Sequence, residues 1–444
     1  MSEIKSIYSN RCWIDGKLQP ATIHCADGKI TAIDFFEIPG SINVGDDILM
    51  PGVIDAHVHV NEPGRTEWEG FETATQAAVA GGITSFADMP LNASPVTTTI
   101  DAFHEKINST KGKCSMNVAF YGGLIPENIN DQLPVLLQSG ISGIKCFLVH
   151  SGIDDFPNVT KADLEKAMPV IAKYKIPLLV HCEMYDEIVE TGLQEDTGNY
   201  AKYLASRPKK WENEAIEMMI DLCRKYDCPV HIVHVSSAEA LPMIAAAKAE
   251  GLPITAETCS HYLFFSAEEI PDHSTIYKCA PPIREKANNM LLKKALADGV
   301  LDFITTDHSP APPNLKEIET GNLLKAWGGV AVLQFLLSAS WTAMKELISV
   351  EAFIPMVTSN PAKFLQLQNK GDIKAGNDAD LLVWSPEAAS LVNQNEILHR
   401  YDVSPYVGQK LFGVIRKTIV GGKIVYDHFK VNKNIKAGTL LFHK

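Results

Sequence analysis

Short apolar runs alternate with longer helix-like segments through the middle of this 444-residue chain. Eight runs have the length and composition of buried strands, at residues 54–59, 83–89, 118–122, 144–149, 178–182, 230–235, 254–259 and 301–306. Helix-like patterns lie between them, among others at residues 71–80, 161–174, 212–225, 238–249 and 290–297. Strands that alternate with helices indicate βα units and a parallel sheet. Eight repeats over about 250 residues are typical of a (β/α)8 barrel, or TIM barrel.

A doubly wound open sheet is the alternative α/β fold for the same alternation. No Gly-x-Gly-x-x-Gly motif follows a first strand, which argues against the nucleotide-binding form of that fold. The eightfold repeat therefore favours the barrel. Residues 330–342 and 350–357 predict further helices beyond the last strand.

The two ends of the chain show a different pattern, in which short β-prone runs are separated by turns. These runs lie at residues 6–14, 21–25, 30–35, 378–384, 414–420 and 424–426. Asp15-Gly16 and Asp27-Gly28 separate the first three runs, and Asp-Gly turns between β-prone runs are hairpin signals. We therefore expect residues 1–50 and 366–444 to form one small β-sandwich domain, which brackets a barrel over residues 51–365.

Composition is that of an ordinary globular protein, with 46% hydrophobic and 21% charged residues. The net charge of −13, without a dense Lys/Arg run, disfavours nucleic acid or an anionic membrane as a partner. No apolar stretch approaches the roughly 20 residues needed to span a bilayer. Met1-Ser2-Glu3-Ile4-Lys5 has no apolar signal core. The nine cysteines form no Cys-x-x-Cys pair, so we expect a reducing, cytoplasmic location.

The first barrel run ends in Asp55-Ala56-His57-Val58-His59. Residues two apart on a strand share a face, so His57 and His59 project together. Two convergent imidazoles are half of a typical metal site. Taken alone, one of them could equally be a hydrogen-bonded core residue and the other an exposed one.

Other strand ends carry residues of the same chemistry, and active-site groups of such barrels sit at the C-terminal ends of the strands. The fourth run contains Lys145, and the fifth, sixth and eighth lead to His181, His234 and Asp307. Alone, His181 could be a satisfied core histidine and Asp307 a helix N-cap. Together these residues predict a metal site. His231 lies three residues before His234 and faces the other way on a strand, so we expect it to pack or hydrogen-bond.

Lys145 is the unusual member of this set. An unpaired ammonium inside a barrel is costly and would shift its pKa. The side chain could instead reach solvent or form a Schiff base. A cation is the wrong charge beside a metal, whereas carboxylation by CO2 would make Lys145 a carbamate anion able to bridge two cations.

The Pro-Gly-x-Ile-Asp-x-His-x-His entry and the later strand ends resemble the cyclic-amide branch of the amidohydrolase superfamily. That branch includes dihydroorotases, hydantoinases (dihydropyrimidinases) and allantoinases, and the resemblance covers almost the whole chain. It implies two divalent metal ions with a bridging hydroxide as the nucleophile. The implied ligands are His57 and His59 for one metal, His181 and His234 for the other, carboxylated Lys145 as the bridge, and Asp307 as both ligand and proton shuttle. These ligands suit Zn²⁺ first, and also Co²⁺, Mn²⁺ or Fe²⁺.

Loop motifs discriminate within the branch. Dihydroorotases typically read His-x-His-x-Arg in the first strand, where the Arg pairs with the substrate carboxylate. Here that residue is Asn61, whose neutral amide cannot form a bidentate charged clamp. The segments most similar to allantoinases are residues 58–71, 88–92, 145–148, 257–263 and 327–330.

The implied reaction is hydrolysis of the hydantoin ring of allantoin to allantoate, a step of purine breakdown, with a small neutral cyclic ureide as the substrate. Hydrolysis of another cyclic amide, by a hydantoinase, dihydropyrimidinase or dihydroorotase, is the alternative activity. A non-catalytic scaffold is the alternative from another class. The resemblance also implies a homo-oligomer, since tetramers are common in this branch.

Three residues are candidates for binding the polar ring. Ser309 lies two residues past Asp307, and Asn92 and the backbone around Cys279 are further candidates. We expect Arg65 and Trp68 to order the first βα loop. We expect Arg284 to form a salt bridge or to anchor a loop.

Overall fold

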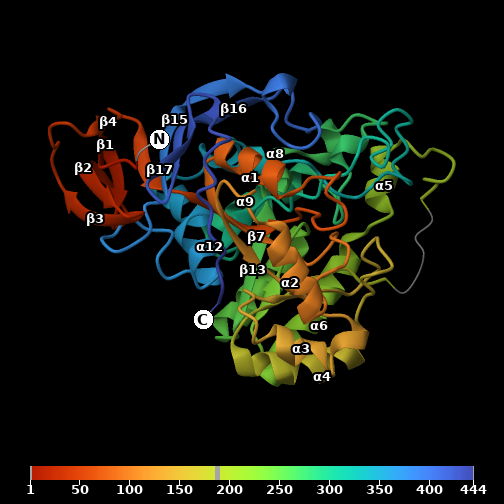
Figure 1. The fold of residues 1–444 in the computed structure, drawn as a ribbon. Helices are drawn as coiled ribbons and strands as arrows, with labels where there is room; N and C mark the ends of the chain where they lie inside the picture. Colours follow the sequence, from red (N-terminus) through yellow and green to blue (C-terminus); the bar gives the residue numbers. More distant parts are fainter. Residues whose placement is uncertain (1–2, 186–190, 444) are drawn as a thin grey trace.

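The computed structural model describes residues 3–185 and 191–443, and its elements are labelled in Figure 1. Met1, Ser2 and Lys444, which belong to the predicted β-domain, lie outside the described residues. A β-sheet built from both ends of the chain, coloured red and blue in Figure 1, lies beside a body of alternating strands and helices.

The predicted runs form a closed parallel barrel with eight strand positions. Its strands are β6 (Val53–Val58), β7 (Ile83–Asp88), β8 (Asn117–Phe120) continued by β9 (Gly122–Gly123), β10 (Ile144–Phe147), β11 (Leu178–His181), β12 (Val230–Ile232), β13 (Ile254–Cys259) and β14 (Phe303–Thr305). All neighbouring pairs are parallel. A bridge between Val58 and His308 joins the last strand position to the first, with a 2.8 Å hydrogen bond from His59 N to His308 O. The predicted TIM barrel is confirmed.

A helix follows each strand position and covers the outside of the barrel. These helices are α1 (Phe71–Ala80), α2 (Ile100–Ser109), α3 (Gln132–Leu136), α4 (Lys161–Ile171), α6 (Lys209–Tyr226), α7 (Leu241–Ala249), α9 (Lys286–Ala297) and α10 (Leu336–Met344). Shorter helices lie in the connections, at α5 (Tyr200–Ala205), α8 (Ser260–Phe264), α11 (Val350–Phe353) and α12 (Ser359–Phe364). The helix predicted from residue 330 begins later, with a 3-10 turn at Leu333–Phe335, because Val330 forms a bridge with His308.

The strands from both ends of the chain form one hydrogen-bonded sheet. They are β1 (Ser6–Ile14), β2 (Lys17–Ala26), β3 (Lys29–Asp34), β4 (Ile42–Asn43), β5 (Ile48–Pro51), β15 (Leu381–Leu391), β16 (Lys410–Val420), β17 (Lys423–Asp427) and β18 (Lys430–Val431). The order is β18-β17-β16-β15-β5-β1-β2-β3, with β4 beside β1. The two ends meet where β5 pairs antiparallel with β15. Both Asp-Gly turns have positive φ at each residue, 49° and 77° in the first, as type I′ hairpins require.

A β-domain made from both ends of the chain is thus confirmed, and one hydrophobic cluster joins Ile7 and Ile23 of the first segment to Leu381 and Ile419 of the second. The exact domain limits stay a prediction. The last residues leave this sheet and return to the barrel, where Val118 of β8 donates to Thr439 O and accepts from Leu441 N.

All nine cysteines are buried and none forms a disulfide, which fits their expected behaviour as small apolar residues. Within residues 3–185 and 191–443, no helix combines the length and apolarity that crossing a membrane would require.

Candidate metal centre and active-site cavity

All six predicted metal ligands line one cavity of about 280 Å³ at the C-terminal ends of the barrel strands. They come from five strand positions, and each is less than 10% exposed. His234 and Asp307 follow their strands with φ angles of 38° and 46°. Such left-handed backbone is uncommon for residues other than glycine and often marks functional sites. Here the left-handed residues are the second residue after β12 and the second after β14, and both of them line the cavity.

The first group of predicted ligands contains His57, His59 and Asp307. The Nε2 atoms of the two histidines lie 3.2 and 3.3 Å from Asp307 Oδ1. In the described residues these three side chains form a cluster whose ligand atoms all lie within 4.8 Å of one another. Such spacings suit ligands of one small cation with bonds of about 2.0–2.2 Å. The shared face predicted for His57 and His59 is what allows both to reach Asp307.

The second group lies on the neighbouring strands. His181 Nδ1 and His234 Nε2 are 3.1 Å apart, and Lys145 lies on β10 next to them. Lys145 Nζ is fully buried and has no hydrogen-bond partner among the described residues, and the same holds for His57 Nε2 and His234 Nδ1. Buried polar groups are normally paired, so these orphaned nitrogens fit a centre that is completed by bound cations. Burial also lowers the pKa of Lys145 to about 8.

Two buried carboxylates that the sequence analysis did not assign hold the histidines from behind. Glu257 Oε1 lies 2.6 Å from His57 Nδ1, and Glu183 Oε2 lies 2.9 Å from His181 Nε2. Burial raises the pKa of Glu183, but the charge of Arg207 and the hydrogen bond from His181 outweigh it and hold the pKa well below its usual range. Metal-binding histidines commonly donate their second N–H to such a carboxylate. Both acids stand inside or just after apolar runs, and that signal could have identified them.

Comparison with known proteins agrees with this geometry. The model of the Amidohydrolase family matches residues 48–425. The chain belongs to the amidohydrolase family. It is 42% identical over 430 residues to the allantoinase of Streptomyces avermitilis, covering 95% of this chain and 96% of that protein. It is 37% identical to the allantoinase of Saccharomyces cerevisiae, covering 99% of both chains. Among solved structures, the L-hydantoinase (dihydropyrimidinase) from Arthrobacter aurescens superposes with a TM-score of 0.91 at 27% identity, covering 98% of this chain and 99% of that one.

Within the amidohydrolases the chain groups with the allantoinases, and it is a cyclic amide hydrolase. Amidohydrolases generally bind divalent metals. The cluster of His57, His59 and Asp307 is the part of this chain that has that ligand chemistry in compact form.

The amidohydrolase cavity contains cations that the sequence did not reveal, namely Arg207, Lys278 and Lys325, and the protein itself engages the first two. Arg207 lines the cavity, but its Nε and Nη2 atoms lie 3.1 and 2.5 Å from the two oxygens of Glu183. Lys278 also lines the cavity and donates to the carbonyl of Ala326 at 2.5 Å. Burial lowers the pKa of Lys278 to about 8. A substrate carboxylate would therefore have to compete with existing partners for Arg207 or Lys278.

The three predicted substrate residues lie in different positions. Ser309 and Asn92 line the cavity. Cys279 is buried behind the wall, where its carbonyl accepts a 2.7 Å hydrogen bond from the Tyr203 hydroxyl. The following residue, Ala280, is the one that lines the cavity.

Asn61, the residue that separates this chain from dihydroorotases, is buried beneath the cavity wall. Its amide donates to Pro310 O at 3.2 Å, and its Oδ1 accepts from Asn92 Nδ2 at 3.4 Å. Asn61 therefore supports the loop that carries Asn92 and is not one of the described residues that line the cavity.

The expected loop-ordering residues behave as predicted. Arg65 donates to Asn92 O at 2.6 Å, and its guanidinium lies 5.3 Å from the Trp68 ring. Trp68 in turn packs edge to face against Trp327 of the cavity wall. Arg284 bonds Glu212 and the backbone carbonyl of Arg207, so it anchors the segment that carries Arg207.

Proposed function

We propose that this amidohydrolase opens the hydantoin ring of allantoin and releases allantoate. The observation that carries the proposal is the convergence of four histidines, Lys145 and Asp307 from five strand positions on one small cavity. Similarity to allantoinases over nearly the whole chain supports this choice of ring. The neutral character of allantoin suits a cavity in which the arginine is already paired with Glu183.

We infer that two divalent cations belong to this site, Zn²⁺ before Co²⁺, Mn²⁺ or Fe²⁺. His57, His59 and Asp307 would hold one of them and His181 and His234 the other. When bound, such cations polarise an amide carbonyl and lower the pKa of water from 15.7 to about 7.

Lys145 would stand between the two cations as its carbamate. In that modification the neutral amine bonds to the carbon of CO2 and releases one proton, so the side chain gains a carboxylate. The orphaned, buried position of Lys145 Nζ and the lowered pKa of its ammonium support this assignment. An anion there would also remove the unpaired buried charge.

Asp307 is placed to carry the proton of the reaction. Burial raises the pKa of its carboxyl group, but His57 and His59 outweigh burial and hold the pKa well below its usual range, so the group is an ionised carboxylate at neutral pH. It would take the proton of the attacking water and return it to the ring nitrogen when the amide bond breaks. Ser309 and Asn92 would hydrogen-bond the substrate ring, while Trp327 and Phe147 close the cavity around it.

Hydrolysis of a hydantoin or dihydropyrimidine ring is the second candidate. It is favoured by the superposition on the Arthrobacter aurescens L-hydantoinase. Dihydroorotate ranks lower because it carries a carboxylate for which the cavity offers no free arginine among the described residues. A scaffold without activity would have no reason to retain all six ligand positions.

One assay separates these candidates. The purified protein, supplied with divalent metal and bicarbonate, is offered allantoin, hydantoin, dihydrouracil and dihydroorotate, and ring opening is followed for each. We expect allantoin to have the highest kcat/KM. Turnover of dihydroorotate without turnover of allantoin would refute the proposal. Failure to open any ring, together with absence of bound metal, would favour the scaffold.

A variant of Lys145 tests the bridging role directly. We expect Lys145→Ala to lose bound metal, measured by elemental analysis, and to lose activity. A short carboxylic acid should restore part of both because it can occupy the place of the carbamate. Lys175→Ala, which removes an exposed lysine near the opposite end of the barrel, is the control. Full activity of Lys145→Ala without added acid would disprove the role.

We also infer that the protein acts as a homo-oligomer, a tetramer before other states, in the cytoplasm. The free, buried cysteines support a reducing compartment. Light scattering coupled to size-exclusion chromatography measures the mass in solution, and a mass near that of the 48.7 kDa chain would contradict the oligomer.

A further inference from the structure

A chain of hydrogen bonds leads from His57 away from the cavity, through the interior of the barrel. His57 Nδ1 lies 2.6 Å from Glu257 Oε1, and Glu257 Oε2 lies 3.1 Å from His231 Nε2. His231 Nδ1 in turn lies 2.8 Å from Thr255 Oγ1. His57, Glu257 and His231 are fully buried. The reaction proposed above uses none of the other three members of this hydrogen-bond chain, which are Glu257, His231 and Thr255.

The strand pattern accounts for the alignment. Thr255 and Glu257 are two residues apart on β13, so their side chains share the same face. The parallel register of β12 and β13 places His231 directly beside Thr255. His231 therefore has a hydrogen-bonding role across the strands, which is one of the two roles expected for it from the sequence.

Glu257 fixes the direction of the hydrogen bonds. An ionised carboxylate only accepts, so both imidazoles donate to it. When a cation takes the place of the Nε2 proton, His57 keeps its proton on Nδ1 and offers the lone pair of Nε2, the atom 3.2 Å from Asp307 Oδ1. Neutral His231 donates through Nε2 and accepts from the Thr255 hydroxyl through Nδ1.

Aromatic rings restrain His231. Its ring stacks on Phe303 with centroids 5.3 Å apart and an interplanar angle of 8°, and it lies 4.2 Å from the ring of Phe364 on α12. Rotation of the imidazole would disturb both contacts. The tautomer chosen by Glu257 is thus combined with a fixed ring position.

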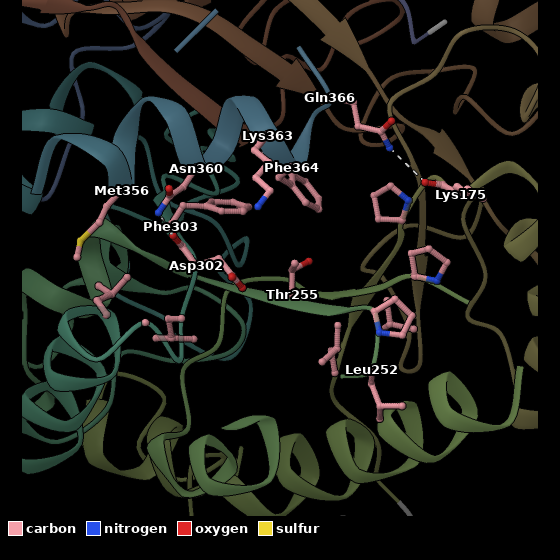
Figure 2. Close-up of a pocket in the computed structure, with 18 of the residues that line it drawn as sticks. Lys175, Leu252, Thr255, Asp302, Phe303, Met356, Asn360, Lys363, Phe364 and Gln366 are labelled. Atoms are coloured by element: carbon pink, nitrogen blue, oxygen red, sulfur yellow. Dashed lines mark hydrogen bonds between the residues drawn. The ribbon is translucent and has the colours of Figure 1, made fainter. Parts of the chain in front are cut away.

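The hydrogen-bond chain ends in Thr255 at a second cavity, of about 600 Å³, at the opposite end of the barrel. Figure 2 shows Thr255 on the wall of this cavity together with Phe303 and Phe364. Pro177, Pro229 and Pro253, which precede β11, β12 and β13, line the same space. Thr255 is partly exposed there, whereas His57, Glu257 and His231 are fully buried inside the barrel.

We propose that Glu257, His231 and Thr255 are positioning residues that fix the tautomer and orientation of His57 for metal binding. The inference rests on the proposed metal centre and extends it to a hydroxyl at the far end of the barrel. Loss of residues that support metal ligands in this way typically lowers metal affinity or activity by about 10- to 100-fold. We expect a loss in that range when His231 can no longer bond Glu257.

Two substitutions interrupt the hydrogen-bond chain and keep a side chain of similar volume at each position. His231→Phe keeps a ring between Phe303 and Phe364 but removes both nitrogens. Thr255→Val is isosteric and removes only the hydroxyl, while Thr255→Ser keeps it. The control is Thr22→Val in the β-domain, because Thr22 also donates a hydrogen bond from a buried position, to Phe36 O.

Two measurements are made on each variant. Zn²⁺ affinity is measured by competition with a chelator. The tautomer of His57 is measured in the metal-free protein at pH 10, because Asp307 and Glu257 outweigh burial and raise the pKa of His57 to about 9. The measurement is ¹⁵N NMR of the ring nitrogens, assigned with His57→Asn. In His231→Phe the Glu257 carboxylate loses the partner of Oε2 and is free to turn away from His57 Nδ1. We therefore expect this variant to bind Zn²⁺ about 10- to 100-fold more weakly and to populate the Nε2–H form of His57. Thr255→Val should shift both measurements in the same direction by less, and Thr255→Ser and Thr22→Val should resemble the wild type.

Wild-type affinity and an unchanged His57 tautomer in folded His231→Phe would overturn the proposal. If His231→Phe does not fold, the comparison of Thr255→Val with Thr255→Ser decides by the same two measurements, and equal values overturn it. If the wild type itself binds no Zn²⁺, the proposed metal centre fails. The tautomer measured in metal-free protein still decides whether the hydrogen-bond chain positions His57.

Discussion

A buried ion pair supports the loop that carries His59, and its loss should be costly. Lys106 of α2 reaches the end of β7, where Nζ lies 2.5 Å from Asp88 Oδ2 and 2.9 Å from Met89 O. Asp88 Oδ1 accepts from Val60 N at 2.9 Å. Neither charged side chain is more than 1% exposed. The pair therefore fixes the residue next to His59 to the neighbouring strand.

Lys106→Met retains most of the side-chain volume but leaves the Asp88 carboxylate buried with one backbone donor. Breaking a buried pair in this way costs about 3–5 kcal/mol. Burial already raises the pKa of Asp88, and loss of the ammonium would raise it further until the carboxyl group takes a proton. Removing both charges in Asp88→Asn/Lys106→Met should recover much of the loss, because paired replacement of a buried ion pair is often close to neutral.

Urea unfolding at pH 7 measures the free energy of unfolding for the wild type, both single variants and the double variant, which closes a double-mutant cycle. Lys294→Met is the control, since Lys294 pairs with Asp298 on the surface and such pairs contribute at most about 1 kcal/mol. The reasoning would be refuted if Lys106→Met lost no more stability than this control. It would also fail if the two single losses simply added in the double variant.

Two further predictions concern acid stability and substrate binding. Burial lowers the pKa of His399 to about 3, whereas the unfolded chain takes up this proton near pH 6.5. The contribution of His399 to the free energy of unfolding is therefore complete above pH 6.5. As the pH falls toward 3, that contribution is lost by up to about 1.4 kcal/mol per pH unit. His399→Asn should flatten that slope in urea unfolding at pH 7.5 and 5.0, and an unchanged slope contradicts the assignment. Lys316 is buried and donates to the carbonyls of Lys278, Trp327 and Gly329. Because Lys278 and Trp327 line the active-site cavity, Lys316→Met should raise KM more than it lowers kcat and speed proteolysis within residues 312–327. Wild-type KM and wild-type cleavage would contradict this.

The sequence predicted the barrel well, and it predicted which residues would meet at the cavity, because both depend on local pattern. Strands covered on both faces appear as apolar runs, so His181 or Lys145 inside or at the end of such a run stands out. Parallel strands bring their C-terminal ends to one face, which joins residues far apart in the chain. The six residues that line the cavity as candidate ligands therefore followed from eight runs and the residues at their ends.

Features set by contacts between distant segments were not predictable in this way. Arg207 and Lys278 lie in long connections, and their position over the cavity depends on partners such as Glu183 and the backbone of Ala326. The helix expected from residue 330 started later because Val330 pairs with His308, a contact that hydrophobic periodicity does not encode. Periodicity predicted that His231 faces away from His234, but β12 ends at Ile232 and the left-handed backbone of His234 lets both side chains lie inside the barrel. Periodicity also could not name Glu257 and Thr255 as the partners of His231.

The closure of the barrel determines when the proposed metal centre can form during protein synthesis. His57 and His59 stand on one side of the join between the first and last strands, and Asp307 stands on the other, 250 residues later in the chain (307 − 57). Since domains fold as units while the chain emerges from the ribosome, the nascent protein carries both histidines long before their third ligand is made. Retention of a divalent metal at the proposed site should therefore begin only after translation has passed the eighth strand, so metal supply matters at the end of synthesis and not at its start.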